Sequence, residues 1–298
     1  MRVPSHHMPC WQLVTLVGVV SSACSAKPNM DTSLPSPSQS TPTKQFTTIT
    51  FAHPSGVALS LDLFKPNGKR NLHRGILLIH GGGWVGGIRG EMTDIGTLLA
   101  QKGFTCASVD YRFAPKWPWP AQLEDVQQAV RFMRAHATEW GIDPNHIGAS
   151  GISAGGHLSA FLATTYPPGA STQVQAAGCI SSIDDLNLPL TPEGETYHIV
   201  QKLLGETSVP DRERRTKASP ITFFDRRTSP ILFIQGKQDP LVPSEQTAVA
   251  VAKLKSLKVA TDAIYVDGMQ HGINASEPRQ AKALEAMADW MTKHLAVR

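Results

Sequence analysis

The chain has 298 residues, of which 41% are hydrophobic and 17% are charged. This composition is typical of a globular protein with a packed core and excludes a disordered or fibrous one. The 28 Lys and Arg residues exceed the 24 Asp and Glu residues only slightly, and no segment gathers them into the basic stripe that nucleic acid requires. We therefore expect no nucleic-acid partner.

The first 24 residues have the pattern of an export signal. Arg2 precedes an apolar run at 11–20, and small residues lead up to Cys24. The run is about half of the ~20 residues that span a bilayer, which disfavours a permanent transmembrane helix. The small residues before Cys24 resemble a bacterial lipobox, although Ser21 stands where lipoboxes usually carry Leu. We expect an exported lipoprotein of the cell envelope or periplasm, attached to membrane only through a lipid on Cys24, with plain secretion as the alternative.

Residues 25–45 are rich in Ser, Thr and Pro, which predicts a linker. Residues 46–298 show no further boundary and no repeat, so we expect them to form one domain. The segments 46–52 and 57–64 alternate with a period of two, as half-buried antiparallel strands do. Short apolar runs typical of strands covered on both faces follow at 75–80, 104–111, 146–151, 175–183, 230–236 and 262–268.

Helices are predicted between these strands, at 90–101, 121–137, 154–164, 244–257 and 278–295. The alternation of strands and helices indicates an α/β fold, with a mainly parallel central sheet flanked by helices. Residues 184–220 are too long for an ordinary connection and predict a small cap insertion. Cys106 and Cys179 fall in separate predicted strands, where they are either small buried residues or partners in a disulfide.

A serine closely surrounded by glycines lies between a predicted strand and a predicted helix. Gly151-Ile152-Ser153-Ala154-Gly155 matches the G-x-S-x-G pattern. A nucleophile on a sharp strand-to-helix turn has a strained backbone, and its neighbours two residues away must be small because helix and strand approach closely there. The pattern alone is weak, because an ordinary glycine-rich turn also produces it. Its place in the chain makes Ser153 the candidate nucleophile.

A serine hydroxyl needs a base, and the base needs an orienting acid. His271 follows the last predicted strand and is the candidate base, while Asp239 follows the strand before it and is the candidate acid. Asp225 and Asp267 are weaker candidates, because only Asp239 leaves an apolar strand into a turn bounded by proline. The chain order Ser, Asp, His is that of α/β hydrolases.

A third motif, His80-Gly81-Gly82-Gly83, follows an early predicted strand. Its glycines can present backbone N–H groups without a side chain in the way. Acyl transfer places negative charge on the carbonyl oxygen, and prearranged donors there are worth about 3 kcal/mol each. We predict that the N–H groups of Gly82, Gly83 and Ala154 form an oxyanion hole.

These motifs together resemble a known family. The segments HGGGW, DYRFAP, GISAGG, GKQDPLVP and GMQHG occur in the order seen in α/β hydrolases of the hormone-sensitive lipase-like and BD-FAE-like esterases, and the resemblance runs from about residue 46 to 295. It implies the α/β hydrolase fold, Ser153, Asp239 and His271 as catalytic residues, and the same three oxyanion donors. In some members Trp84 supplies a donor in place of one glycine.

The resemblance also bears on other motif residues. It implies structural roles for Asp110, Tyr111, Arg112 and Asp125, such as a buried ion pair or a cap. We expect His157 to pack beside the Ser153 turn. Trp117 and Trp119 either pack in the core or a loop, which is the commoner fate of Trp beside Pro, or stack on a sugar.

The leading hypothesis is a serine carboxylesterase without metal or cofactor, acting on a small-molecule or carbohydrate ester with a short acyl group such as acetyl or feruloyl. One alternative is a serine exopeptidase of the prolyl oligopeptidase type, although residues before 46 leave no room for the usual propeller. The other is a catalytically silent binding module with the same fold, although every catalytic position is filled.

Overall fold

The structure, a computed structural model, describes residues 46–66, 70–167, 171–188, 194–207 and 209–296. All of them belong to one compact unit, Lys44–Arg298. The export signal, the lipid attachment at Cys24 and the linker predicted at 25–45 lie outside the described residues. Within these ranges, no helix combines the length and the apolar character needed to cross a bilayer.

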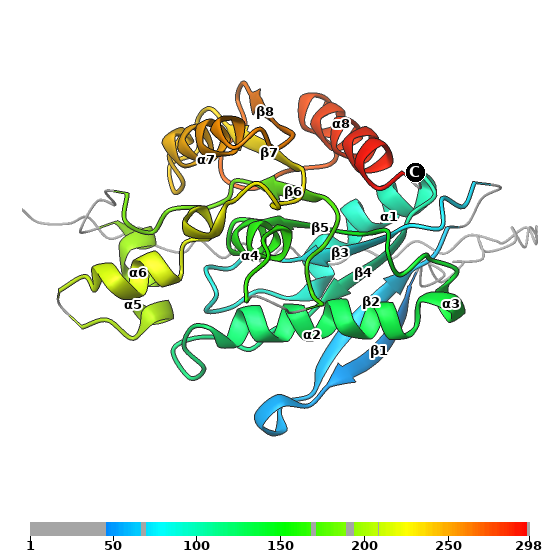
Figure 1. The fold of residues 1–298 in the computed structure, drawn as a ribbon, viewed down its shortest axis with the longest axis horizontal. Helices are drawn as coiled ribbons and strands as arrows, with labels where there is room; N and C mark the ends of the chain where they lie inside the picture. Colours follow the sequence, from blue (N-terminus) through cyan, green and yellow to red (C-terminus); the bar gives the residue numbers. More distant parts are fainter. Residues whose placement is uncertain (1–45, 67–69, 168–170, 189–193, 208, 297–298) are drawn as a thin grey trace, which may run out of the picture. The chain divides into compact units, whose positions relative to one another are not determined.

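A single mixed sheet forms the centre of the unit (Figure 1). In the described part of the chain it has eight strands, in the order β1-β2-β4-β3-β5-β6-β7-β8. Their bounds are β1 Thr47–Ala52, β2 Leu59–Phe64, β3 Gly75–Ile79, β4 Thr105–Val109, β5 Ile147–Ile152, β6 Ala177–Ile180, β7 Ile231–Gly236 and β8 Thr261–Val266.

The strands from β4 to β8 along the sheet are parallel, while β2 is antiparallel to both of its neighbours. In the parallel part, Ile79 of β3 lies opposite Gly151 of β5, and Ile180 of β6 lies opposite Ile234 of β7. The carboxyl ends of β3, β5, β6 and β7 therefore meet at one edge, where ligand sites of parallel sheets are found.

Helices cover both faces of this sheet (Figure 1). On one face lie α2 Ala121–Ala135, α3 Ala137–Trp140, α4 Ala154–Ala163 and α7 Ser244–Ser256; on the other lie α1 Thr93–Gln101 and α8 Pro278–His294. The inner strands are buried on both sides: Leu77 of β3 faces the first group, and Ile76 faces the second. The short 3-10 helices are η1 Pro54–Gly56, η2 Arg89–Met92 and η3 Pro220–Phe223.

The predicted α/β hydrolase architecture is confirmed, with differences in detail. The helix expected at 90–101 is divided into η2 and α1, and the one at 121–137 ends at Ala135 before the separate α3. Strand β2 was expected to be half-buried, but five of its six residues are buried, because Leu61 and Leu63 pack in the core on one face of the sheet and Phe64 packs in the core on the other. The segment at 262–268 was expected to be covered on both faces; instead β8 is an edge strand in which only Val266 is buried.

The turn between β5 and α4 is packed against the end of β3 through two glycines. A Cβ atom on Gly155 would collide with the carbonyl oxygen of Ile79, and one on Gly151 would collide with the backbone of Gly155. Neither neighbour is a flexible side-chain end that could move aside. The glycines on both sides of Ser153 are therefore required by close backbone contacts, as the sequence pattern predicts.

Substituting Gly155→Ala should destabilise the fold by about 3 kcal/mol or more, because backbone must move to admit the methyl group. Gly90→Ala is the matched control, since the nearest atom to its added Cβ lies at 3.7 Å, an ordinary contact. Urea unfolding of both variants measures the difference. Equal stability of the two variants would contradict the close-contact argument.

Candidate active site

Ser153 occupies the sharp turn between β5 and α4. Its φ of 56° and ψ of −116° are unusual for a residue with a side chain, and such strain persists only where the surroundings impose it. The backbone N–H of Ser153 donates to the carbonyl oxygen of Ile180 at 2.8 Å, which ties the turn to the end of β6. The side chain lies at the amino end of α4, where the helix dipole favours negative charge.

The glycine loop after β3 lies beside this turn. Gly82, Gly83 and Trp84 are consecutive residues with positive φ, at 92°, 58° and 60°. The loop closes on itself, because Val85 and Gly86 both donate to the Gly82 carbonyl oxygen at 3.1 Å. A side chain on Gly82 would collide with the backbone of Gly86. This positive-φ run turns the backbone sharply, and at two of its three positions the residue is glycine, which adopts positive φ readily.

The predicted oxyanion donors are unpaired in the described part of the chain. The backbone N–H groups of Gly82, Gly83 and Ala154 have no hydrogen-bond acceptor among the described residues. Gly82 and Gly83 line the same cavity as Ser153. Tyr111 fixes the start of the loop, because its buried hydroxyl donates to the Gly81 carbonyl oxygen at 2.8 Å. Free N–H groups beside a serine are the arrangement that binds a developing oxyanion.

His271 and Asp239 are hydrogen-bonded to each other. The Nδ1 atom of His271 lies 2.9 Å from Oδ2 of Asp239 and 3.1 Å from Oδ1. A carboxylate only accepts, so Nδ1–H donates and Nε2 is left free to act as a base. Asp239 also accepts from the backbone N–H groups of Leu241 and Val242, both at 2.9 Å.

Burial works to raise the pKa of Asp239, but the hydrogen bonds from His271 and the backbone of Val242 and Leu241 outweigh it and hold the pKa below its ordinary value. Asp239 is therefore ionised at neutral pH, although its side chain is almost completely buried. A carboxylate held in this way fixes the imidazole orientation of His271 and stabilises its protonated form.

The two rival acids lie elsewhere. Asp225 pairs with Arg227 at 2.8 Å, and Asp267 pairs with Lys237 at 2.9 Å. Neither contacts His271 in the described part of the chain. The structure therefore brings Asp239 to His271, as the position of Asp239 after an apolar strand predicts.

One cavity of about 240 Å³ contains the predicted site. Its walls come from the glycine loop, the Ser153 turn, the loops after β6, β7 and β8, and a helix of the expected cap: Gly82, Gly83, Trp84, Val85, Ser153, Ile183, Glu195, Thr196, Ile199, Leu241, Val242 and His271. Among the described residues no hydrogen bond joins the Ser153 hydroxyl to His271. Such bonds are often long before substrate binds.

The sequence patterns did not identify the cap residues that line this cavity. The expected insertion contains α5, Glu195–Leu204, and α6, Arg212–Lys217. Ile199 of α5 lies directly over the glycine loop, because a Cβ atom on Gly83 would lie 2.7 Å from Cγ2 of Ile199. Glu195 and Thr196 stand on the same helix at the cavity wall. No motif marks these residues, since the amphipathic pattern of α5 would fit any packed helix.

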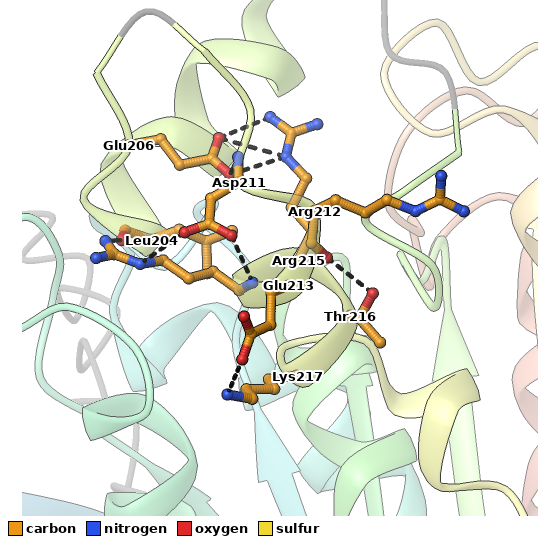
Figure 2. A network of polar contacts seen from close by, with 9 residues as sticks. Leu204, Glu206, Asp211, Arg212, Glu213, Arg215, Thr216 and Lys217 are labelled. Atoms are coloured by element: carbon orange, nitrogen blue, oxygen red, sulfur yellow. Dashed lines mark hydrogen bonds and ion pairs between the residues drawn. The ribbon is translucent and has the colours of Figure 1, made fainter.

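A buried ion pair joins α6 to the segment that directly follows α5 (Figure 2). Arg215 of α6 binds Glu206 through Nε–Oε1 at 3.0 Å and Nη2–Oε2 at 2.8 Å, and both side chains are buried. Asp211 caps the start of α6 by accepting from the N–H of Arg214 at 3.0 Å. Arg215 also stacks over the ring of Tyr197 in α5. The wall that carries Ile199 is thus fixed by charge pairing and stacking within the cap.

His157 packs beside the Ser153 turn, as expected. Its Nε2–H donates to the Ala218 carbonyl oxygen at 2.8 Å, and its Nδ1 accepts from the Trp84 indole N–H at 3.3 Å. Burial lowers the pKa of His157 to about 4, so the ring is neutral at physiological pH. One imidazole therefore joins the glycine loop and α4 to the end of the cap insertion.

The other motif residues have structural contacts. Arg112 and Asp125 form a buried ion pair, with Nε–Oδ2 and Nη2–Oδ1 both at 2.8 Å, and Asp110 pairs with Arg89 at 2.7 Å. Trp119 packs against His157 and Phe161, with ring centroids 5.3 and 5.0 Å apart. The Trp119 ring is thus part of the core packing.

The two cysteines and Trp117 complete the set of predicted residues. Cys106 in β4 and Cys179 in β6 are buried free thiols, and burial raises the pKa of each. They are therefore small core residues and not a disulfide. Trp117 is half-buried and stacks with Lys116, whose Nζ lies 4.3 Å from the ring centroid.

A family comparison agrees with this geometry. The model of the BD-FAE family matches residues 61–254, about two-thirds of the chain. The chain belongs to the BD-FAE family. The match includes the glycine loop, Ser153 and Asp239, and it ends before His271.

Individual proteins resemble this BD-FAE family member to different extents. Esterase LipC of Mycobacterium tuberculosis is 32% identical over 213 residues, covering 67% of this chain and 53% of LipC. The chain spans about half the length of three curated relatives that it matches, with 53%, 44% and 54% of each covered.

Two solved structures match this chain over most of their own length. A truncated carbohydrate esterase from gut microbiota is 25% identical with a TM-score of 0.72, covering 85% of this chain and 98% of that one. An acetyl ester-xyloside bifunctional hydrolase from Caldicellulosiruptor lactoaceticus is 20% identical with a TM-score of 0.70, covering 83% and 96%, and shares the fold.

A buried carboxyl lies behind the cavity wall of this BD-FAE protein. Asp184 follows Ile183, is completely buried, and accepts a hydrogen bond from the Ser182 hydroxyl at 3.1 Å. Its second oxygen has no hydrogen-bond partner among the described residues. Burial raises the pKa of Asp184 to about 7. The folded protein therefore holds the Asp184 proton more tightly than the unfolded chain does.

This pKa predicts a stability change with pH. An unfolded Asp loses its proton near about pH 4, so stability falls as pH rises from there to the folded pKa of about 7. The variant Asp184→Asn lacks this pH-dependent contribution to the free energy of unfolding. Its unfolding free energy relative to the parent should improve by about 2–3 kcal/mol from about pH 5 to about pH 8.

Urea unfolding at several pH values measures this difference. Asp94→Asn, at an exposed position in α1, controls for the exchange of a carboxyl for an amide. A constant difference between Asp184→Asn and the parent across this range would contradict a buried, protonated Asp184.

Proposed function

We propose that this chain is a serine carboxylic ester hydrolase that cleaves short-chain acyl esters without a metal or cofactor. The observation that carries the proposal is the cavity in which Ser153 and the Asp239-bound His271 meet the unpaired N–H groups of the glycine loop. A nucleophile, an oriented base and oxyanion donors around one space are the parts that acyl transfer requires. The names of LipC and of the gut carbohydrate esterase support the same activity.

The reaction proceeds in two halves. His271 Nε2 takes the proton of Ser153 as the hydroxyl oxygen attacks the ester carbonyl carbon, and the carbonyl oxygen becomes an oxyanion held by the N–H groups of Gly82, Gly83 and Ala154. His271 then gives the proton to the leaving alcohol, which departs as the acyl-enzyme forms. Water attacks the acyl-enzyme with His271 again as base, and the carboxylic acid leaves. Asp239 stabilises the imidazolium in both halves.

The proposed acyl group is short, such as acetyl. The cavity has a volume of about 240 Å³, at or below the lower end of typical ligand pockets. Ile199 closes it above Gly83, and Ile183 and Val242 add further apolar surface. The proposed alcohol is a carbohydrate, which rests on the gut carbohydrate esterase and the open rim at Glu195.

Ser153→Ala should lower hydrolysis of p-nitrophenyl acetate by about 10⁴-fold or more while leaving the fold intact, because the attacking oxygen is lost. A fluorophosphonate probe should label the parent protein at Ser153 and leave the variant unlabelled. Circular dichroism verifies the fold. Full activity in the variant would overturn the assignment, and a parent that is neither labelled nor active would instead indicate a catalytically silent binding module.

The acid can be tested in the same assay. Asp239→Asn should lower kcat by about 10³–10⁴-fold, because an amide no longer fixes the donating Nδ1–H of His271. Asp267→Asn is the matched control, since Asp267 also directly follows a strand, β8, but its carboxylate pairs with Lys237. Equal losses in both variants would contradict the role of Asp239.

Acyl-chain selectivity tests the proposed substrate class. Ile199→Ala should raise the ratio of kcat/KM for p-nitrophenyl hexanoate over acetate by about 10-fold, because a removed side chain admits additional methylenes worth about 1–3 kcal/mol. Val209→Ala, on an exposed part of the same cap, is the control. An unchanged ratio would show that α5 does not limit the acyl site. Acetylated xylan, tested with the parent protein, then examines the carbohydrate alcohol.

A further inference from the structure

The end of β6 and the residue after it contact the Ser153 turn, the strand that leads to Asp239 and the loop that carries His271. Ile180, the last residue of β6, accepts the N–H of Ser153 through its carbonyl oxygen at 2.8 Å. The next residue, Ser181, donates its backbone N–H to the Ile234 carbonyl oxygen at 2.9 Å, on the strand that leads to Asp239. The Ser181 hydroxyl oxygen accepts the N–H of Gly272, directly after His271, at 3.3 Å.

Ser181 has an unusual backbone conformation at the position from which its hydroxyl accepts the Gly272 N–H. Its φ is 47°, and the residue is completely buried. Positive φ is rare for residues with a side chain, and glycine would adopt it more readily. A glycine could not supply the hydroxyl oxygen that meets the Gly272 N–H. The backbone strain at Ser181 therefore coincides with a hydrogen bond that only its side chain makes.

We propose that Ser181 is a positioning residue that fixes the His271 loop relative to the Ser153 turn. This inference rests on the proposed function, in which His271 must reach the Ser153 hydroxyl. Gly272 itself has a φ of 85°, and its loop leaves the edge strand β8. The Ser181 hydroxyl ties this loop directly to the residue next to Ile180, which already holds the Ser153 turn. The distance between His271 and Ser153 is thus set by the peptide unit that joins Ile180 to Ser181.

The substitution Ser181→Ala removes the acceptor and keeps a side chain at positive φ, whereas Ser181→Gly removes the acceptor and relieves the strain. Both should lower kcat for p-nitrophenyl acetate by about 10- to 100-fold with KM changed by less than about twofold, because a displaced base affects the chemical step more than substrate binding. If Ser181→Ala fails to fold, Ser181→Gly tests the same hydrogen bond.

The control is Ser108→Ala in β4. Its buried hydroxyl donates to the Arg89 carbonyl oxygen at 2.7 Å, and among the described residues it forms no hydrogen bond with a loop of the proposed site. This variant should keep kcat within about twofold of the parent, even if its melting temperature falls as much as the melting temperatures of the Ser181 variants. An equal loss of kcat in Ser108→Ala, or parent-like kcat in both Ser181 variants, would overturn the proposal.

Amide hydrogen exchange at Gly272, followed by NMR, is a readout that does not depend on catalysis. Exchange should accelerate at least about 10-fold in both Ser181 variants and stay unchanged in Ser108→Ala, because only the former lose the acceptor. Parent-like exchange in the Ser181 variants would refute the positioning role whether or not the chain hydrolyses esters. A parent that shows no fluorophosphonate labelling would instead refute the proposed function, so the two failures are distinguishable.

Discussion

The close contact between the first turn of α4 and the end of β3 is the constraint on which the site depends. Gly155 approaches the Ile79 carbonyl oxygen so closely that no side chain fits between them. This approach aims the start of α4 at the loop that leaves β3. Ser153, which directly precedes α4, and the glycine loop therefore line one small cavity. The strained backbone of Ser153 is maintained because packing on both sides leaves it no alternative.

The scaffold and the cap contribute different properties to this space. The sheet provides rigid strand ends, and the loops after β3, β5, β7 and β8 carry the proposed reacting groups, which is how open parallel sheets generally form their sites. The cap adds an apolar wall through Ile199, held by the buried pair of Arg215 and Glu206. Breaking a buried pair by removing one partner leaves an uncompensated charge. The chemistry and the shape of the cavity are therefore stabilised by separate sets of interactions, which leaves selectivity free to vary while the reacting groups stay in place.

The sequence predicted the parts of the molecule that depend on local pattern. Alternating and apolar segments located the eight strands seen in the described residues, and the proline-bounded turn after an apolar strand distinguished Asp239 from Asp225 and Asp267. Contacts between distant segments could not be obtained in this way. The placement of Ile199 over Gly83 depends on how an inserted segment folds back, and Ser181 stands in an ordinary run of small residues. The exposure of β8 was mispredicted because composition does not show which strand lies at the edge of a sheet.

The hydrogen bond from His157 to the Ala218 carbonyl oxygen has a consequence for how such scaffolds diversify. This hydrogen bond lies where the inserted segment rejoins the core. Its acceptor is a backbone carbonyl oxygen, which any residue type at position 218 supplies as long as the backbone keeps its place. Cap sequences can therefore be exchanged or resized upstream of this point while the junction keeps its registration with α4 and with Trp84. In recombination between relatives, position 218 is the natural point at which to join a new cap to the core. A grafted cap that brings the backbone back to this position keeps an acceptor for the Nε2–H of His157. A cap that returns the backbone elsewhere leaves this buried donor without a partner.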